Sequence, residues 1–266
     1  MRPKGTCRLC LVPSRVRQWR ASARWARVLL TGAIVSGSLI ALVVAFPISA
    51  MEVVVGAVIS IWITLLMGAI EKPELDLMLY KPGASTRFRA GNHRGYVAQL
   101  RLRNKPIPGW VSKWLQLYRN AATQTTGTIT FRNLDGEQAG KGTMGIRWST
   151  SPQPGHWQVE STPHGEQTKR YVYDLERLTT VRAIPPGYSE DGVLDVAARY
   201  DGEGHCYGYN NESYSHDFKT PRWKLTQEQY LVDVYITASN ATCRGTFRLV
   251  NRGNSETEFY LTDADE

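Results

Sequence analysis

Val53–Ile70 reads VVVGAVISIWITLLMGAI, and Val28–Phe46 reads VLLTGAIVSGSLIALVVAF; these two stretches of eighteen and nineteen residues carry no charge. A helix rises about 1.5 Å per residue, so each stretch covers roughly 27–29 Å, close to the ~30 Å hydrocarbon core of a bilayer. Only six residues, Pro47–Glu52, join them. Two antiparallel helices satisfy their own backbone groups in lipid. The sequence therefore predicts an N-terminal transmembrane α-helical hairpin over residues 28–70, with spans 28–46 and 53–70.

Two other interpretations suit parts of this pattern. A buried hairpin of a soluble protein is disfavoured by the length of two neighbouring uncharged runs. A cleaved signal peptide fits the basic start, but its apolar run is too long and a second span follows almost at once. Cleavage near Ala50 would still leave the second helix as an anchor.

Small residues recur every fourth position in both spans, which places them on nearly one helix face. Such a stripe lets two helices approach closely in lipid. It predicts packing between the two helices of one hairpin, or, alternatively, a seam for a homo-oligomer. The residues of the stripe are Ala33, Gly37, Ala41, Ala45, Gly56, Ser60, Thr64 and Gly68.

The positive charge is concentrated at the N-terminus. The chain has 266 residues, with 32 Lys+Arg against 24 Asp+Glu and a formal charge of +8. Residues 1–27 hold eight bases and no acid, whereas residues 71–266 are nearly balanced. The high isoelectric point therefore belongs to a basic tail, and we expect no nucleic acid as a partner. By the positive-inside rule, both termini and the soluble domain are predicted to be cytoplasmic, in a two-span protein of the cell membrane whose first partner is the lipid bilayer.

Two features favour the opposite side of the membrane. Cys206 and Cys243 are candidates for a disulfide, which would indicate an oxidising compartment. Asn211-Glu212-Ser213 and Asn240-Ala241-Thr242 match the N-glycosylation tripeptide. Buried unpaired cysteines are equally common and such tripeptides arise by chance, so the cytoplasmic assignment is retained.

From residue 71 onward the hydrophobic pattern alternates, as in β-strands. Turn residues separate the runs, and Ser151–Ser189 has few strand signals. We therefore predict one mainly-β domain over 71–266, an immunoglobulin-like β-sandwich with a long insertion. Tyr230 is placed like the tyrosine of a tyrosine corner, whose hydroxyl caps the backbone just upstream. The predicted strands are Leu75–Tyr80, Tyr96–Asn104, Thr126–Asn133, Met144–Ser149, Val193–Tyr200, Tyr230–Ala238, Cys243–Asn251 and Glu258–Thr262.

Pro106–Arg119 carries an aromatic stripe at helical spacing. Trp110, Trp114, Leu117 and Tyr118 fall on one face of a short helix or loop cover. Such a stripe usually packs against a core; alternatively, it is the part of the domain that leans on the bilayer, because Trp is enriched at membrane interfaces.

Tyr200–Phe218 (YDGEGHCYGYNNESYSHDF) is the densest polar and aromatic stretch. One interpretation is an ordered loop, whose Asn and Asp side chains bond to their own backbone and whose tyrosines pack on the sandwich. Another is a ligand or partner surface formed by Asp201, His205, Tyr207, Tyr209, Asn210, Asn211, Glu212 and His216.

Catalysis has weaker support in the same stretch. His205 and His216 with neighbouring acids are candidate metal ligands, but their spacing matches no ligand signature. A dyad of Cys206 and a histidine would need a base within hydrogen-bond reach. No phosphate-loop, GxSxG, HExxH, kinase or Rossmann motif occurs, so no cofactor and no catalytic residue is predicted.

The blocks LDVAARYDGEGHCYGYNNESY and YLVDVYITASNATCRGTFRLVN, within Val193–Asn251, resemble an uncharacterised family of prokaryotic membrane-anchored proteins. LRLRNKP at Leu100–Pro106 and RWSTSP at Arg147–Pro152 are similar to earlier blocks of that family. The resemblance covers most of residues 72–262. It implies two N-terminal transmembrane helices followed by an immunoglobulin-like sandwich, and it implies no activity.

Three functions follow from these observations. The first is a membrane-anchored module that binds a protein or a small ligand at the membrane surface. The second is an extracytoplasmic sensor or envelope-structure domain with Cys206 bonded to Cys243. The third is a metal-assisted hydrolase around His205 and His216. The sequence favours the first, a binding role rather than an enzyme.

Overall fold

The computed structural model describes residues 48–90, 93–161, 167–178, 181–187 and 189–265. The chain divides into two compact units, Met1–Leu66 and Met67–Glu266. The basic tail 1–27 and the predicted span 28–46 lie outside the described residues, and with them Ala33, Gly37, Ala41 and Ala45 of the small-residue stripe.

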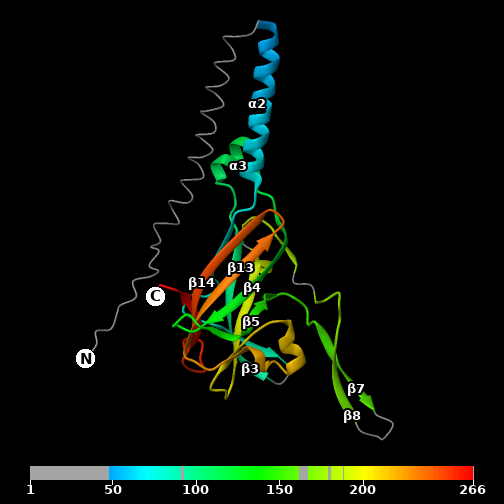
Figure 1. Cartoon of the computed structure of the whole chain (residues 1–266), viewed down its shortest axis with the longest axis vertical. Helices are drawn as coiled ribbons and strands as arrows, with labels where there is room; N and C mark the ends of the chain where they lie inside the picture. Colours follow the sequence, from blue (N-terminus) through cyan, green and yellow to red (C-terminus); the bar gives the residue numbers. More distant parts are fainter. Residues whose placement is uncertain (1–47, 91–92, 162–166, 179–180, 188, 266) are drawn as a thin grey trace, which may run out of the picture. The chain divides into compact units, whose positions relative to one another are not determined.

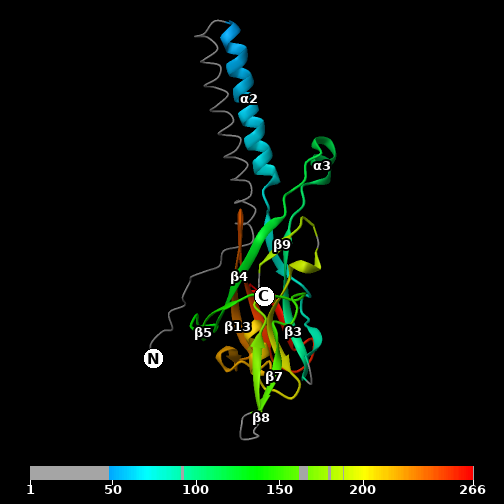
Figure 2. The ribbon, with the colours of Figure 1, turned by 90° about the vertical axis from the view of Figure 1, so that its right-hand side faces the viewer.

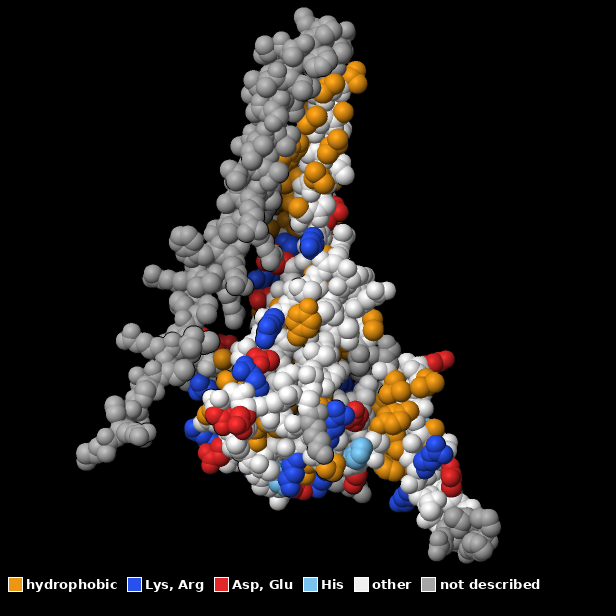
Figure 3. All heavy atoms as spheres, in the orientation of Figure 1, with side chains coloured by type: hydrophobic (Ala, Val, Ile, Leu, Met, Phe, Trp, Pro, Cys, Tyr) orange, Lys and Arg blue, Asp and Glu red, His pale blue; other side chains and the backbone are white. Residues whose placement is uncertain are grey.

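Helix α2 spans Ile48–Glu71 and includes the second predicted span. Its stretch Val53–Glu71 is long and apolar enough to cross a membrane, and Figure 3 shows apolar side chains along its surface. The predicted turn Pro47–Glu52 is wrong in part, because Ile48–Glu52 are already helical. After Pro47 this segment has no residue that breaks a helix, and Pro is tolerated at a helix start. The Thr64 hydroxyl donates to the Ser60 carbonyl, so its polar group is satisfied within the helix.

The second unit is built from antiparallel sheets (Figures 1 and 2). In the first sheet the strand order is β1-β3-β10-β11-β12, with β2 also paired to β3 and β6 to β10. Only Lys72, Pro73 and Glu74 separate α2 from β1. The strands of this sheet are β1 (Leu75–Leu79), β2 (Thr86–Ala90), β3 (His93–Asn104), β6 (Arg147–Trp148), β10 (Val193–Tyr200), β11 (Cys206–Gly208) and β12 (Lys224–Leu225).

The second sheet has the order β15-β14-β13-β4-β5, with β9 paired to β4. A separate hairpin, β7–β8, extends from the two sheets (Figure 1). These strands are β4 (Ala122–Arg132), β5 (Gln138–Gly145), β7 (Gly155–Ser161), β8 (Gln167–Tyr173), β9 (Arg182–Ile184), β13 (Gln229–Ala238), β14 (Ala241–Asn251) and β15 (Phe259–Asp263). The connections contain helix α3 (Gly109–Leu115) and the 3₁₀ turns η1 (Glu190–Gly192), η2 (Asn211–His216) and η3 (Pro221–Trp223).

One hydrophobic core lies between the two sheets, because inward side chains of both belong to the same cluster. Leu100 and Val196 enter it from the first sheet, and Phe131, Val234 and Leu249 enter it from the second. The buried Arg199 adds a polar link across the core, since its guanidinium donates to the Asn251 side chain of the other sheet.

Strands β3 and β10 form the centre of the first sheet, and β10 and residues 95–100 of β3 are buried on both faces. All eight residues of β10 are buried. The pairing is so close that a Cβ at Gly95 would lie 2.1 Å from the Arg199 carbonyl oxygen, which requires glycine there. The outer face of β10 therefore needs a cover of its own.

The strand predictions agree with the structure wherever alternation is strong. β10 has the predicted bounds, and β13 and β14 form the expected hairpin around Ser239-Asn240. The Tyr230 hydroxyl accepts a hydrogen bond from the Gln227 backbone N–H at 2.5 Å, as predicted for its capping role. The predicted strand Met144–Ser149 is instead divided between β5 and β6, and the insertion Ser151–Ser189 contains β7, β8 and β9.

The core predicts a contrast between two leucines. Leu249→Ala removes a side chain with no exposed surface and should lower the free energy of unfolding by about 2–5 kcal/mol. Leu134→Ala, at a residue 56% exposed, should change it by less than about 0.5 kcal/mol. Chemical denaturation of the full chain in detergent measures both; equal losses would contradict the assigned core.

Candidate functional site

A second, smaller cluster covers the outer face of the first sheet. Along a strand successive side chains point to opposite faces. Tyr200 and Tyr207 therefore lie on the outer face, where they join Tyr209, while Tyr214 and Phe218 pack on them from the η2 segment. The stretch Tyr200–Phe218 is thus the cover that β10 requires.

Arg147 holds this cover in place from β6. Its side chain is 3% exposed and stacks on the Tyr214 ring, with the guanidinium carbon 4.8 Å from the ring centroid. Its Nη1 donates to Asn211 Oδ1 at 2.5 Å. Its Nη2 donates to the carbonyl oxygens of Ser151 and Pro152 and to the Tyr214 hydroxyl. A buried guanidinium needs such partners, because an unpaired buried charge is costly.

Asp195 is the buried acid of the same region. Gln99 Nε2 donates to its Oδ1 at 2.8 Å, and the same Nε2 lies 2.9 Å from Ser149 Oγ. Burial raises the pKa of Asp195 above its ordinary value of 3.8, and the bonds from Gln99 and the charge of Arg147 offset only part of that rise. A carboxyl with a raised pKa in a cleft would be a catalytic candidate, but Asp195 is packed within the fold.

Four of the eight predicted surface residues are used to fold the cover. Asn210 caps η2, accepting from the Glu212 N–H, and its own N–H donates to Ser213 Oγ. Asn211 Oδ1 accepts from Arg147, and Asn211 Nδ2 donates to the Leu178 carbonyl. The asparagine of this glycosylation tripeptide therefore has a structural role. Glu212 accepts from the Trp223 indole N–H at 3.1 Å, and the Tyr209 hydroxyl donates to that of Tyr214.

His205 and Tyr207 belong to a polar cluster at the surface, which we call the Glu203 cluster (Glu203, His205, Tyr207, Lys219). His205 Nε2 lies 2.7 Å from the Tyr207 hydroxyl and 3.1 Å from Glu203 Oε2. Lys219 donates to Glu203 Oε1 at 2.7 Å, and this bond lowers the pKa of Glu203 and raises that of Lys219. Partial burial lowers the pKa of His205, which favours the neutral ring.

The remaining predicted residues, Asp201 and His216, are exposed. His216 Nδ1 faces Ser215 Oγ and the Glu212 carbonyl within its own turn. Among the residues that the structure describes, no group of three or more His, Cys, Asp or Glu side chains is arranged to hold a metal ion. The arrangement that a hydrolase around His205 and His216 would need is therefore not formed there.

Cys206 faces away from His205 and Tyr207. It belongs to the main core, whereas Tyr207 belongs to the outer cluster. Burial raises the pKa of the Cys206 thiol to about 12, so it is a poor nucleophile. Cys206 is also a free thiol, so the predicted bond to Cys243 is not formed in the structure.

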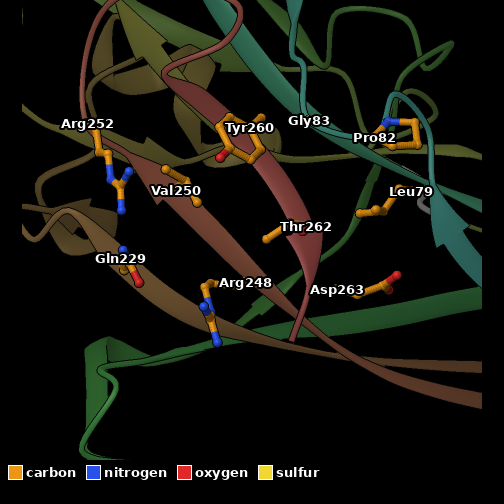
Figure 4. Close-up of a pocket in the computed structure, with 10 residues that line it drawn as sticks. All are labelled: Leu79, Pro82, Gly83, Gln229, Arg248, Val250, Arg252, Tyr260, Thr262 and Asp263. Atoms are coloured by element: carbon orange, nitrogen blue, oxygen red, sulfur yellow. The ribbon is translucent and has the colours of Figure 1, made fainter. Parts of the chain in front are cut away.

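A pocket that the sequence analysis did not identify lies on the outer face of the second sheet (Figure 4). It has a volume of about 410 Å³, within the range of ligand sites. Arg248 and Arg252 bring two positive charges to a lining whose single acid is Asp263; Val250 lies between the two arginines and Tyr260 on the neighbouring strand. We call it the Arg248–Arg252 pocket; its lining is Leu79, Pro82, Gly83, Gln229, Arg248, Val250, Arg252, Tyr260, Thr262 and Asp263.

In comparisons with protein-family models, with curated proteins and with solved structures, no match to this chain was found. The function proposed for the protein therefore rests on the chemistry of the described sites.

The raised pKa of Asp195 predicts a pH-dependent loss of stability. The folded state holds this proton more tightly than the unfolded state, so the contribution is complete below pH 3.8 and is lost as pH rises through the raised folded pKa. Asp195→Asn keeps the acceptor for Gln99 and cannot titrate. Urea unfolding over a pH series should show the wild type losing stability relative to Asp195→Asn as pH rises. Parallel curves would contradict the assignment.

Proposed function

We propose that the protein is a membrane-anchored β-sandwich module that acts at the membrane surface. It binds a partner or ligand that carries an acidic group. The single observation that carries the anchoring is α2, whose apolar stretch Val53–Glu71 runs into β1 after only three residues. The binding role rests on the Arg248–Arg252 pocket, which combines two positive charges, a volume of about 410 Å³ and apolar lining side chains.

The finer features of this proposal come from the sequence. Two spans, 28–46 and 53–70, form a hairpin; the basic tail places both termini and the β domain on the cytoplasmic side. The β domain is immunoglobulin-like, which the Tyr230 bond supports. In α2 the residues Gly56, Ser60, Thr64 and Gly68 recur every fourth position and offer a face for close helix packing, within the hairpin or in a homo-oligomer.

The Arg248–Arg252 pocket suits carboxylates for geometric reasons. Arg248 and Arg252 lie four residues apart, one in β14 and one just beyond it, and about 13 Å of extended backbone separates their Cα atoms. Arg248 Nη2 donates to the Ala264 carbonyl, which orients its side chain. Two guanidinium groups with apolar side chains beside them suit a ligand that has more than one carboxylate and an apolar portion, or an acidic peptide segment.

The anchoring is tested by placing one charge at two equally exposed aliphatic positions. Ile61 in α2 is 59% exposed and Leu134 in the β4–β5 turn is 56% exposed. In a water-soluble chain both arginine substitutions are tolerated alike. In a membrane span, Ile61→Arg costs about 2.5–3.5 kcal/mol of insertion. We expect Ile61→Arg alone to reduce the fraction of chain that resists alkaline extraction from membranes. A wild-type chain that is monodisperse in buffer without detergent would overturn the proposal.

The pocket is tested with citrate as the probe. At ten times Kd, binding adds about 1.4 kcal/mol of stability, which raises the unfolding midpoint of a domain of this size by about 3–6 °C. We expect this shift to disappear in Arg252→Gln. Arg244→Gln is the matched control, because Arg244 is an exposed arginine of β14, an even number of residues from Arg248 and outside the pocket. Equal shifts in all three chains would show a general salt effect and refute the pocket.

A further inference from the structure

The connection between β3 and β4 presents large aromatic side chains to solvent. Trp110 and Trp114 in α3 are 75% and 85% exposed, and Tyr118, which follows α3, is 73% exposed. The two tryptophans are four residues apart, so they lie on one helix face. Each carries an apolar surface of the size that normally anchors a core or an interface. Contiguous exposed apolar surface of this kind marks an interaction site.

The same segment also supplies the contacts that hold it on the β domain. Ile107 and Leu117, on either side of α3, are each 7% exposed. Ile107 and Leu117 are therefore buried while both indoles face outward. The prediction that the aromatic stripe packs against a core is correct for Leu117 and wrong for Trp110, Trp114 and Tyr118. The exposed face of the segment is therefore available to a partner.

The base of this segment is bonded to the chain where α2 ends. The Asn120 N–H donates to the Glu71 carbonyl at 2.7 Å, and the Lys105 N–H donates to the Glu74 carbonyl at 2.8 Å. Arg119 Nη1 donates to the Lys72 carbonyl, and its Nη2 pairs with the Glu74 carboxylate at 3.2 Å. Both ends of the segment are thus held within a few residues of Glu71, the last residue of the apolar stretch.

The charges of the segment match a phospholipid surface. Lys105–Asn120 contains three bases and no acid. Lys105 pairs with Glu74 and Asp76, and Arg119 pairs with Glu74, whereas Lys113 is exposed on α3 beside the tryptophans. Anionic headgroups attract such bases, and Trp and Tyr concentrate in the headgroup layer because their rings are apolar with one polar group. That layer lies directly beyond the ~30 Å hydrocarbon core that α2 would cross.

We propose that Pro106–Arg119 is an interfacial anchor, in which Trp110, Trp114 and Tyr118 insert into the headgroup layer of the leaflet where α2 ends. This inference rests on the proposed membrane anchoring by α2. The anchor gives the β domain a second attachment to the bilayer, on the segment that also connects the two sheets through β3 and β4.

The experiment places a photo-reactive benzoylphenylalanine at one of three positions in the full chain, in vesicles of phosphatidylcholine and phosphatidylglycerol at 3:1. Position 114 tests the anchor and position 62, within α2, tests the span. Position 157 is the matched control: Trp157 is a tryptophan exposed on β7, and Figures 1 and 2 show α3 and the β7–β8 hairpin at opposite ends of the β domain.

After irradiation, mass spectrometry counts lipid adducts at each position. We expect adducts at 62, and at 114 about ten times the yield at 157, because a ring in the headgroup layer contacts lipid continuously. Adducts at 62 with equal low yields at 114 and 157 would overturn the anchor and leave the span intact. Protein crosslinks at 114 without lipid adducts would also overturn it, in favour of a protein partner. Absence of adducts at 62 would refute the membrane anchoring itself, and the anchor with it.

Discussion

Burial of β10 on both faces is the constraint on which the β domain depends. The inner face packs against the second sheet, and the outer face requires a cover drawn from elsewhere in the chain. The stretch Tyr200–Phe218 supplies that cover. The Arg147 guanidinium donates to Asn211 and Tyr214 within the cover and to the carbonyl oxygens of Ser151 and Pro152 outside it. A charged side chain can serve this purpose only where every neighbour is a suitable acceptor or an aromatic face. Asn210, Asn211 and Glu212 are consequently committed to the fold, whereas Asp201 and His216 are exposed and His205 belongs to the Glu203 cluster at the surface.

Much of the fold could be predicted because a strand with one buried face alternates with period two. β13 and β14 carry that pattern, and Tyr230 caps the start of β13 as predicted. β10 is buried on both faces, and its predicted end follows from the turn Asp201-Gly202. β7 and β8 do not carry the alternating pattern, because both faces of a protruding hairpin meet solvent and the selection for alternation is weak. The sequence singled out the stretch Tyr200–Phe218, but the role of this stretch as a cover depends on Arg147, which lies about 50 residues upstream. The Arg248–Arg252 pocket was missed for the same reason, since β1, β13, β14 and β15 each contribute only a few of its residues.

Among the tryptophans that the structure describes, those of β6 and η3 are buried and those of α3 are exposed. Trp148 and Trp223 are almost completely buried, and the indole N–H of Trp223 finds a carboxylate acceptor in Glu212. Trp110 and Trp114 face solvent on a segment in which Ile107 and Leu117 are buried. Burying an indole stabilises the fold, so a chain that leaves two of them outside forgoes stability at those positions.

The connection between α2 and the β domain is three residues long and hydrogen-bonded to its surroundings at Glu71, Lys72 and Glu74. Even fully extended, three residues reach about 10–11 Å. On the proposed anchoring, the module cannot search the cell interior for its partner. It meets other anchored molecules by lateral diffusion in two dimensions, where confinement to a thin layer raises the effective concentration of both and makes a modest intrinsic affinity sufficient.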